Sequence, residues 1–345
     1  MVPNDLSSYT PSTTPIRVGI VGTGYAAQTR AETLKSDWRS QLVTLTGHTS
    51  DKTKAICQRF NVEASASWEE LVKREDVDLV VISTINRDHG KIVRAALENH
   101  KHVIVEYPLS LDPTEAQNLI ALAQQQNKML HVEHIELLGG LHNAIKKSMG
   151  DIGQVFYARY ITISPKHPAP EKWTYQHSLF GFPFSGALSR FNRLTDLFGL
   201  VQTVNCQSHF WTKPAAKQTD DYQACLCTAQ LQFQKVVLAE AVYGKGEVFW
   251  QSENTFTLYG ENGTLVFTPT QGQLIQGESS QPIEVESRRG LFAKDTQIVL
   301  EHLLHHTPLY VTASESAYTL KVADAAKLSA QTGKVVGIES LKSEE

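Results

Sequence analysis

The sequence has few cysteines, no long apolar run and no excess of charge. Its 345 residues include four cysteines, none of them in a Cys-x-x-Cys pair, which favours reduced, mostly buried thiols in a cytoplasmic protein. No apolar run approaches the ~20 residues that a membrane helix needs. The net charge of −4 argues against nucleic acid as the main partner. The length suits a globular protein of two domains.

Two patterns divide the chain. Residues 1–15 lack the basic start and apolar core of a signal peptide, and we expect a flexible tail there. Over 16–138 apolar strands alternate with helices, which predicts a parallel sheet with helices on both faces. Over 139–345 alternating runs dominate, which predicts an α+β domain with a large, mostly antiparallel open sheet. The last helix, expected at about 314–330, could pack back on the first domain.

A glycine-rich turn follows the first predicted strand. The run from Gly22 to Ala27 reads Gly-Thr-Gly-Tyr-Ala-Ala, and a helix begins within it. Gly22 permits a tight turn, Gly24 lets a pyrophosphate approach the backbone, and the small Ala27 lets the helix lie close to the strand. This pattern predicts a Rossmann domain. The residues expected to contact the dinucleotide here are Gly22, Gly24, Tyr25, Ala26 and Ala27.

The end of the second predicted strand indicates which dinucleotide binds. NAD-preferring sites keep an acidic residue there, but Gly47 occupies the expected position. Donors for a 2′-phosphate follow, namely His48, Thr49, Ser50 and Lys52. The sequence therefore favours NADPH over NADH. Two alternatives stay open: Thr49 or Ser50 could cap the next helix, and Asp51 could be the acid.

Two further runs resemble a known family. Residues 82–89 (Ile-Ser-Thr-Ile-Asn-Arg-Asp-His) and 101–108 (Lys-His-Val-Ile-Val-Glu-Tyr-Pro) are similar to the glucose-fructose oxidoreductase / inositol dehydrogenase / MocA superfamily. The resemblance implies a C-terminal α/β domain whose open sheet carries the substrate site. It also implies a cis peptide bond before Pro108 and further dinucleotide contacts at Thr84, Ile85, Asn86, His89 and Glu106.

The sequence departs from that superfamily where sugars are oxidised. Typical members have a lysine in Glu-Lys-Pro and an Asp-x-Gly-x-His-x-x-Asp helix. Here Tyr107 replaces the lysine, Ser189 the first aspartate and Arg193 the histidine, and only Asp196 remains. Without those groups, the deprotonation of a simple alcohol has no evident base.

One branch of the superfamily fits these departures. Glu106-Tyr-Pro108, the run 131–138 (His-Val-Glu-His-Ile-Glu-Leu-Leu) and the Ser189-Arg190 pair resemble biliverdin reductases, most closely the cyanobacterial ones. The resemblance implies NADPH-dependent reduction of biliverdin IXα at the C10 methine bridge to bilirubin. The hydride would come from nicotinamide C4, and a proton would reach a pyrrole nitrogen.

A predicted helix over 186–198 carries the first candidate catalytic residue. At 100° per residue, Gly186, Ser189, Arg190 and Arg193 share one arc, beside an apolar stripe that should face the core. By resemblance Arg190 is catalytic and contacts the substrate. It would relay a proton through water or stabilise charge on the pigment, because a guanidinium is a poor direct acid. Arg193 either binds substrate or pairs with Asp196 on a solvated face.

Other candidates lie near the expected nicotinamide. Tyr107 is assigned to catalysis and to substrate binding, through stacking or a hydroxyl hydrogen bond. Glu133 and His134 either border this pocket or form a hydrogen-bonded pair at the domain hinge. Alternating strand faces leave no third ligand beside them, so no metal site is predicted. Arg289, with its neighbour Arg288, either meets substrate propionates or forms a solvated basic turn.

Two other functions remain open at this stage. A sugar or polyol oxidoreductase would need His89 or Lys91 to replace the missing base. A non-catalytic NADP-binding regulator would explain the loss of the usual triad. We expect a small-molecule substrate, no nucleic acid and no membrane, with self-association possible through the exposed sheet.

Overall fold

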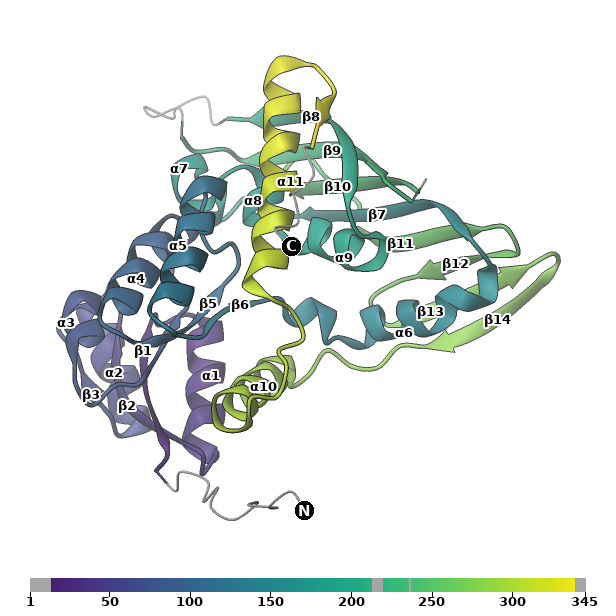
Figure 1. Cartoon of the computed structure of the whole chain (residues 1–345). Coiled ribbons are helices and arrows are strands. Elements are labelled where there is room, and N and C mark those ends of the chain that lie inside the picture. The colour runs from purple at the N-terminus through teal and green to yellow at the C-terminus, as the bar shows by residue number, and fades with distance from the viewer. Residues whose placement is uncertain (1–13, 213–219, 236, 339–345) are drawn as a thin grey trace, which may run out of the picture.

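The structure, a computed structural model, describes residues 14–212, 220–235 and 237–338. The tail predicted at residues 1–15 therefore lies outside the described residues up to residue 13. The described chain forms two sheets with helices between and around them (Figure 1). Within this part of the chain no helix is long and apolar enough to cross a membrane.

The first sheet has six parallel strands in the order β3-β2-β1-β4-β5-β6, as the alternating pattern predicted. Its strands are β1 (Ile16–Val21), β2 (Ser40–Thr46), β3 (Glu63–Ala64), β4 (Leu79–Ile82), β5 (His102–Glu106) and β6 (Leu130–Glu133). Its helices are α1 (Tyr25–Ser36), α2 (Ser50–Phe60), α3 (Trp68–Lys73), α4 (Asn86–Glu98) and α5 (Pro113–Gln125). The strand order reverses between β1 and β4, the place where such sheets bind ligands.

The second sheet has nine strands in the order β14-β13-β12-β11-β7-β10-β9-β8-β15. Among the described strands, only β7 and β10 pair in parallel, so the prediction of a mostly antiparallel sheet is confirmed. Its strands are β7 (Val155–Pro165), β8 (Val201–Trp211), β9 (Ala224–Phe233), β10 (Leu238–Gly246), β11 (Glu253–Gly260), β12 (Gly263–Phe267), β13 (Gln271–Gln276), β14 (Ser279–Glu284) and β15 (Val336–Gly337).

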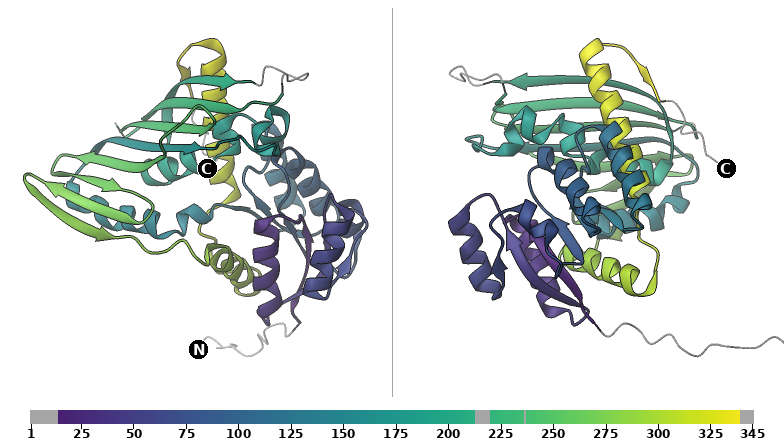
Figure 2. Two further views of the ribbon diagram at one scale, coloured as in Figure 1. Left: turned by 180° about the vertical axis from the view of Figure 1, so that it is seen from behind. Right: turned by 60° about the vertical axis from the view of Figure 1, so that its left-hand side comes forward.

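The helices of the second half are short, except for two near the C-terminus. They are α6 (Gly140–Ser148), α7 (His177–Phe180), α8 (Pro183–Gly186), α9 (Ser189–Phe198), α10 (Leu291–His305) and α11 (Ala313–Thr332). Three short 3-10 helices are η1 (Ile135–Leu137), η2 (Met149–Ile152) and η3 (Trp173–Tyr175). Helices cover one face of the nine-stranded sheet, and Figure 2 shows strands alone on the other.

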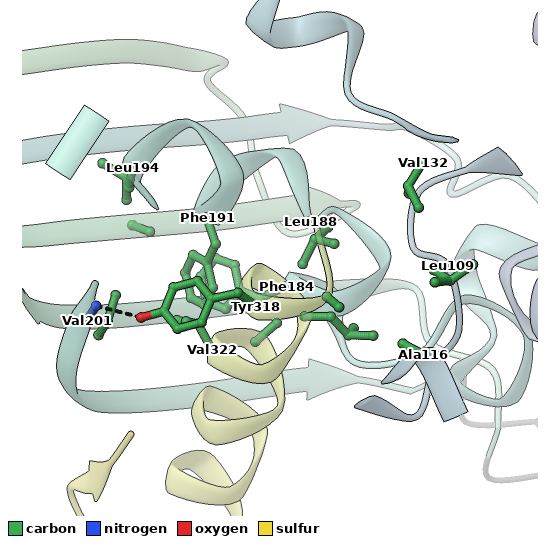
Figure 3. Close-up of a cluster of buried hydrophobic side chains, with 14 of the residues drawn as sticks. Leu109, Ala116, Val132, Phe184, Leu188, Phe191, Leu194, Val201, Tyr318 and Val322 are labelled. Atoms are coloured by element: carbon green, nitrogen blue, oxygen red, sulfur yellow. Dashed lines mark hydrogen bonds between the residues drawn. The ribbon is translucent and has the colours of Figure 1, made fainter. Parts of the chain in front are cut away.

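The main core joins the two halves. The rings of Phe184 and Phe191 stack with centroids 4.4 Å apart, and α11 packs against both β8 and α5. Figure 3 shows Tyr318 of α11 among these side chains, where its hydroxyl accepts a hydrogen bond from the Val201 N–H at 2.7 Å. The last helix, α11, thus packs on α5 of the first half of the chain.

The helix predicted over 186–198 is wrong at its start. α8 ends at Gly186, Ala187 has φ −110° and ψ 46°, and α9 begins only at Ser189. The break brings the backbone of Gly186 against the ring of Phe180, which a Cβ on Gly186 would approach to 2.6 Å. Gly186 therefore does not share a helix face with Arg190, although the apolar stripe of Leu188 and Phe191 is buried as predicted.

Candidate active site

A cleft of about 1040 Å³ lies at the carboxyl ends of the parallel strands. The glycine-rich turn, the ends of β2, β4, β5 and β6, and the first turn of α4 form most of its wall. Four residues from the second half complete it, namely Trp173, Gly186, Arg288 and Phe292. The cleft is therefore the space in which a dinucleotide on the Rossmann sheet would meet a substrate.

The glycine-rich turn has the geometry that its sequence predicts. Gly22 has φ +139°, and a Cβ there would come within 2.2 Å of the Ser83 carbonyl oxygen. Gly24 is the N-cap of α1 and has open space around its α-carbon, so the positive end of α1 faces the cleft. Tyr25 and Ala26 line the cleft, whereas Ala27 is buried against the sheet. This turn could hold a pyrophosphate.

The end of β2 explains the absence of an acidic residue. A Cβ on Gly47 would lie 2.4 Å from Cγ2 of Thr23, so Thr23 fills the space that a longer side chain would need. His48 and Lys52 line the cleft, but Thr49, Ser50 and Asp51 do not. Thr49 is the N-cap residue of α2, without a hydrogen bond from its side chain.

The residues after β4 are placed at the cleft as expected. Thr84, Ile85, Asn86 and His89 all line it. The two ring nitrogens of His89 face the carbonyl oxygens of Pro108 at 2.8 Å and Thr84 at 3.3 Å, and burial lowers its pKa. Lys91 pairs with Asp88 at 3.0 Å. Backbone carbonyls thus face both ring nitrogens of His89, and Lys91, which also lines the cleft, is paired with an acidic neighbour.

Tyr107 connects the cleft to α9. Its peptide bond to Pro108 is cis, as the resemblance implied. The Tyr107 hydroxyl donates to Oγ of Ser189 at 3.3 Å, and its ring stacks on His134 with centroids 5.2 Å apart. Burial raises the pKa of Tyr107 to about 12, although the nearby Arg190 lowers it. The phenol is therefore a neutral hydrogen-bond donor at neutral pH.

Arg190 lies behind the wall of the cleft. Its Nη1 donates to Oγ of Ser189 at 2.9 Å and its Nε to Oγ1 of Thr162 at 3.3 Å. The guanidinium lies over the ring of Tyr243, 5.2 Å from the centroid. The structure thus brings Arg190 to Tyr107 through Ser189, but Arg190 does not itself line the cleft.

The alternative pairing of Arg193 with Asp196 is wrong. Arg193 is 2% exposed, and its Nη2 donates to Glu136 at 2.6 Å. Its Nε and Nη1 have no hydrogen-bond partner among the described residues. Asp196 instead pairs with His142 and Lys146. The side chain packs inward because α9 is buried on that side.

The two arginines before α10, Arg288 and Arg289, lie in different environments. Arg288 lines the cleft and pairs with the same Glu136 that holds Arg193. Arg289, the residue predicted to bind substrate, is exposed and does not line the cleft. The cationic group at this edge of the cleft is therefore Arg288.

A buried ionic cluster under the cleft was not predicted. Arg30 of α1 is fully buried, and its guanidinium donates to Glu106 at 3.0 Å and to Asp295 of α10 at 2.6 Å. Asp295 also accepts from the Tyr310 hydroxyl at 2.7 Å and lies 2.8 Å from Nε2 of His131. One feature of the sequence could have indicated this cluster. Arg30 lies between Ala27 and Leu34 in the apolar stripe of its helix, where a charged residue needs a buried partner.

Glu133 and His134 adjoin this cluster from the end of β6. Glu133 is 2% exposed and lines the cleft, whereas His134 does not line it. Nε2 of His134 lies 2.8 Å from the Ser316 hydroxyl of α11. Burial lowers the pKa of His134 to about 3, so its imidazole is neutral. No group of three His, Cys, Asp or Glu in the described chain is placed to hold a metal ion.

Comparison with known proteins defines the class of this chain. Residues 16–134 match the family model described as "Oxidoreductase family, NAD-binding Rossmann fold". Residues 146–338 match that of the same family's C-terminal alpha/beta domain. The chain belongs to this oxidoreductase family, the one that its glycine-rich turn and its Glu-Tyr-Pro region resembled.

Particular relatives are more informative. The crystal structure of biliverdin reductase from Synechocystis sp. PCC 6803, in complex with biliverdin and NADP+, is 51% identical, with a TM-score of 0.90. The match covers 92% of this chain and all of that one. Biliverdin reductase A of Mus musculus is 27% identical over 85% of this chain and 88% of its own length. Levoglucosan dehydrogenase, at 16% identity and a TM-score of 0.81, shares the fold alone.

Proposed function

We propose that this protein is an NADPH-dependent biliverdin reductase. It would reduce biliverdin IXα at the C10 methine bridge to bilirubin. The observation that carries the proposal is that Tyr107 and Arg190 both donate to the hydroxyl of Ser189, in the place where sugar dehydrogenases of the family keep an amine. The arrangement supplies a hydrogen-bond donor and a cation but no base. The similarity to the Synechocystis enzyme supports the same substrate.

The cofactor would be held by the glycine-rich turn and by the residues that line the cleft after β2, β4 and β5. Gly47 removes the negative charge that would repel a 2′-phosphate, and His48 and Lys52 offer donors to it. Bound NADPH supplies the hydride, from C4 of its nicotinamide. Residues of this chain then have to orient the bilin, neutralise its developing charge and provide a proton.

Arg190 suits the second of these tasks. Addition of hydride to a conjugated methine carbon places negative charge on the pyrrole and lactam groups of the bilin. A guanidinium held behind the cleft wall by Ser189 and Thr162 would stabilise that charge electrostatically, in part through the Ser189 hydroxyl to which it donates. Tyr107 would present its ring and its hydroxyl to the pigment. Arg288, which lines the cleft and pairs with Glu136, is suited to a propionate, whereas the buried Arg193 would hold Glu136 in place.

A direct assay tests the proposal. Biliverdin and NADPH are incubated with the protein, and we expect the pigment absorbance to move to shorter wavelength while NADPH is consumed. Inositol or glucose with NADP+ serves as the comparison, and we expect no turnover. If NADPH binds but biliverdin is unchanged at every pH at which the protein stays folded, the proposal fails. Turnover of a polyol would favour the sugar oxidoreductase instead.

A further inference from the structure

Two carboxyl groups meet at the floor of the cleft. Glu106 ends β5, Glu133 ends β6, and the two are register partners in the parallel pair. Partners in neighbouring parallel strands point to the same side of the sheet. Both side chains line the cleft next to Tyr107. The carboxyl groups lie close enough that the negative charge of Glu106 raises the pKa of Glu133.

The charges around the pair also require a retained proton. Arg30 faces three carboxyl groups, those of Glu106, Asp295 and Glu133. Among the described residues the groups that act on Glu133 include these and the phenols of Tyr107 and Tyr310. The guanidinium of Arg30 cannot by itself neutralise the buried Asp295 and Glu133 together with Glu106, whose side chain is 18% exposed, and an unpaired buried charge is costly.

Of the three carboxyl groups, that of Glu133 is the one best placed to keep a proton. Asp295 is held as an anion by Arg30, His131 and Tyr310, and its pKa lies below the usual range despite burial. Glu106 accepts directly from Nε of Arg30. Within the described part of the chain, Glu133 accepts one hydrogen bond, from the Ile135 N–H. Burial, and then the neighbouring Glu106, raise the pKa of Glu133 well above its usual range.

We propose that Glu133 is the proton donor of the reaction and that Glu106 keeps it protonated. This inference rests on the proposed function. In the step, the O–H bond of the Glu133 carboxyl breaks and an N–H bond forms at a pyrrole nitrogen of the bilin. The methine carbon gains the hydride and its electron pair from NADPH, which is oxidised. Glu133 is left as a carboxylate beside Glu106 and regains its proton from water, so one proton is consumed per turnover.

Infrared spectroscopy tests the proton without the bilin. In the complex with NADP+ at neutral pH, we expect the C=O stretch of a protonated carboxylic acid. Glu133→Gln removes this band but keeps the carbonyl oxygen that accepts the Ile135 N–H. In Glu106→Gln the band titrates at lower pH than in the wild type, because the neighbouring negative charge is gone. Glu278→Gln, at an exposed residue of the β13–β14 turn, leaves the band unchanged.

Kinetics tests the delivery. We expect the single-turnover rate of bilin reduction in the wild type to fall as the pH rises through the titration of the band. Glu133→Gln should be about 100-fold slower and should lose this pH dependence, with KM for the bilin little changed. Its thermal unfolding and NADP+ affinity report whether the variant has folded and built its cleft.

Two sets of results would overturn the assignment. One is a wild-type spectrum without the band, or a band that survives in folded Glu133→Gln. The other is a Glu133→Gln variant that reduces the bilin at the wild-type rate. If the wild type itself reduces no bilin, the proposed function fails and the delivery step with it, whereas the band still decides whether the pair holds a proton.

Discussion

At the scale of residues, the departures from the sugar dehydrogenase pattern depend on one another. Tyr107 and Ser189 touch, and Ser189 touches Arg190. A lysine at position 107 would point at a guanidinium, and like charges at such distances oppose each other's protonation. A tyrosine with a neutral hydroxyl removes that conflict. The loss of the amine base and the use of an arginine on α9 therefore belong to a single change of chemistry.

The first prediction concerns Arg190. Arg190→Ala should lower kcat for bilin reduction by about 100-fold, the order seen when one preorganised donor to a developing charge is removed. Arg190→Lys should recover part of the rate, because it restores charge without the fork geometry. The Kd for NADP+ should stay unchanged in both variants, since Arg190 does not line the cleft. Full activity in Arg190→Ala would refute the role.

The second prediction concerns the choice of dinucleotide at Gly47. Gly47→Asp alone should weaken both nucleotides, because its Cβ would collide with Thr23. With Thr23→Ala added, the aspartate has room, repels a 2′-phosphate and binds ribose hydroxyls, and the preference should move toward NADH by about tenfold or more. The kcat/KM values for NADPH and NADH measure this. Thr23→Ala alone is the control and should keep the wild-type preference.

At the scale of elements, α10 acts as part of the dinucleotide domain although it comes late in the chain. It packs against α1, as Figure 1 shows, and the buried pair of Arg30 and Asp295 fixes the contact. Because the same guanidinium holds Glu106, the position of α10 is tied to the floor of the cleft. The two halves of the chain are thus joined by ionic contacts as well as by the apolar core.

The third prediction concerns this contact. Asp295→Asn keeps the shape of the side chain but leaves Arg30 without a full counter-charge in a buried site, which should lower the free energy of unfolding by about 3–5 kcal/mol. Urea unfolding measures the change. Glu32→Gln, also on an α1 contact, breaks an exposed pair with Arg59 and should cost less than about 1 kcal/mol. Equal effects of the two variants would contradict the role of the Arg30–Asp295 pair in fixing α10 against α1.

The elements that could be predicted are those with a strong apolar period. Five of the six strands of the parallel sheet and helices such as α4 and α5 follow from it, whereas β3, which has two exposed residues, carries no apolar period. β14 escaped prediction because Ser279–Glu284 is an exposed polar edge strand that contains a proline. The break at Ala187 escaped prediction because the close approach of Gly186 to the ring of Phe180 leaves no mark in the apolar period.

The candidate site was predictable only where a local motif marked it. The glycine-rich turn and Tyr107 stand in such motifs. Arg30 and Asp295 are 265 residues apart, and no sequence pattern pairs them. For Arg193 the sequence offered a local partner, Asp196 at i,i+3 on a solvated face. The structure buries Arg193 instead, away from that pairing. Groups whose role depends on a distant partner therefore required the structure.

At the scale of the whole molecule, the nine-stranded sheet leaves one face without helices (Figure 2). Exposed polar side chains such as Gln207, Thr228 and Gln230 alternate there with residues buried on the helical side. This is not the apolar surface that obligate dimers bury. Association of copies through this face stays a prediction, and sedimentation over a range of concentrations would test it.

The last prediction concerns the pH dependence of stability. Burial lowers the pKa of His134 to about 3 and that of His102 to about 4. In the unfolded chain a histidine has a pKa of about 6.5. Between the folded-state pKa values and this one, the unfolded state therefore binds more protons than the folded state. The contribution of these groups is complete above about pH 6.5 and is lost as the pH falls toward 4. The unfolding free energy should therefore fall over this window.

A variant isolates the share of His102 in that loss. Nδ1 of His102 accepts the Met129 N–H at 3.0 Å, which requires an unprotonated nitrogen. His102→Asn can offer an oxygen to the same N–H and takes up no proton, so its unfolding free energy should vary less between about pH 6.5 and 4 than that of the wild type. The same substitution at the exposed His305 should keep the wild-type slope. A slope that is unchanged in His102→Asn would mean that this imidazole does not couple acid to unfolding, and the decline would then belong to His134 and to other histidines whose pKa burial lowers, such as His89.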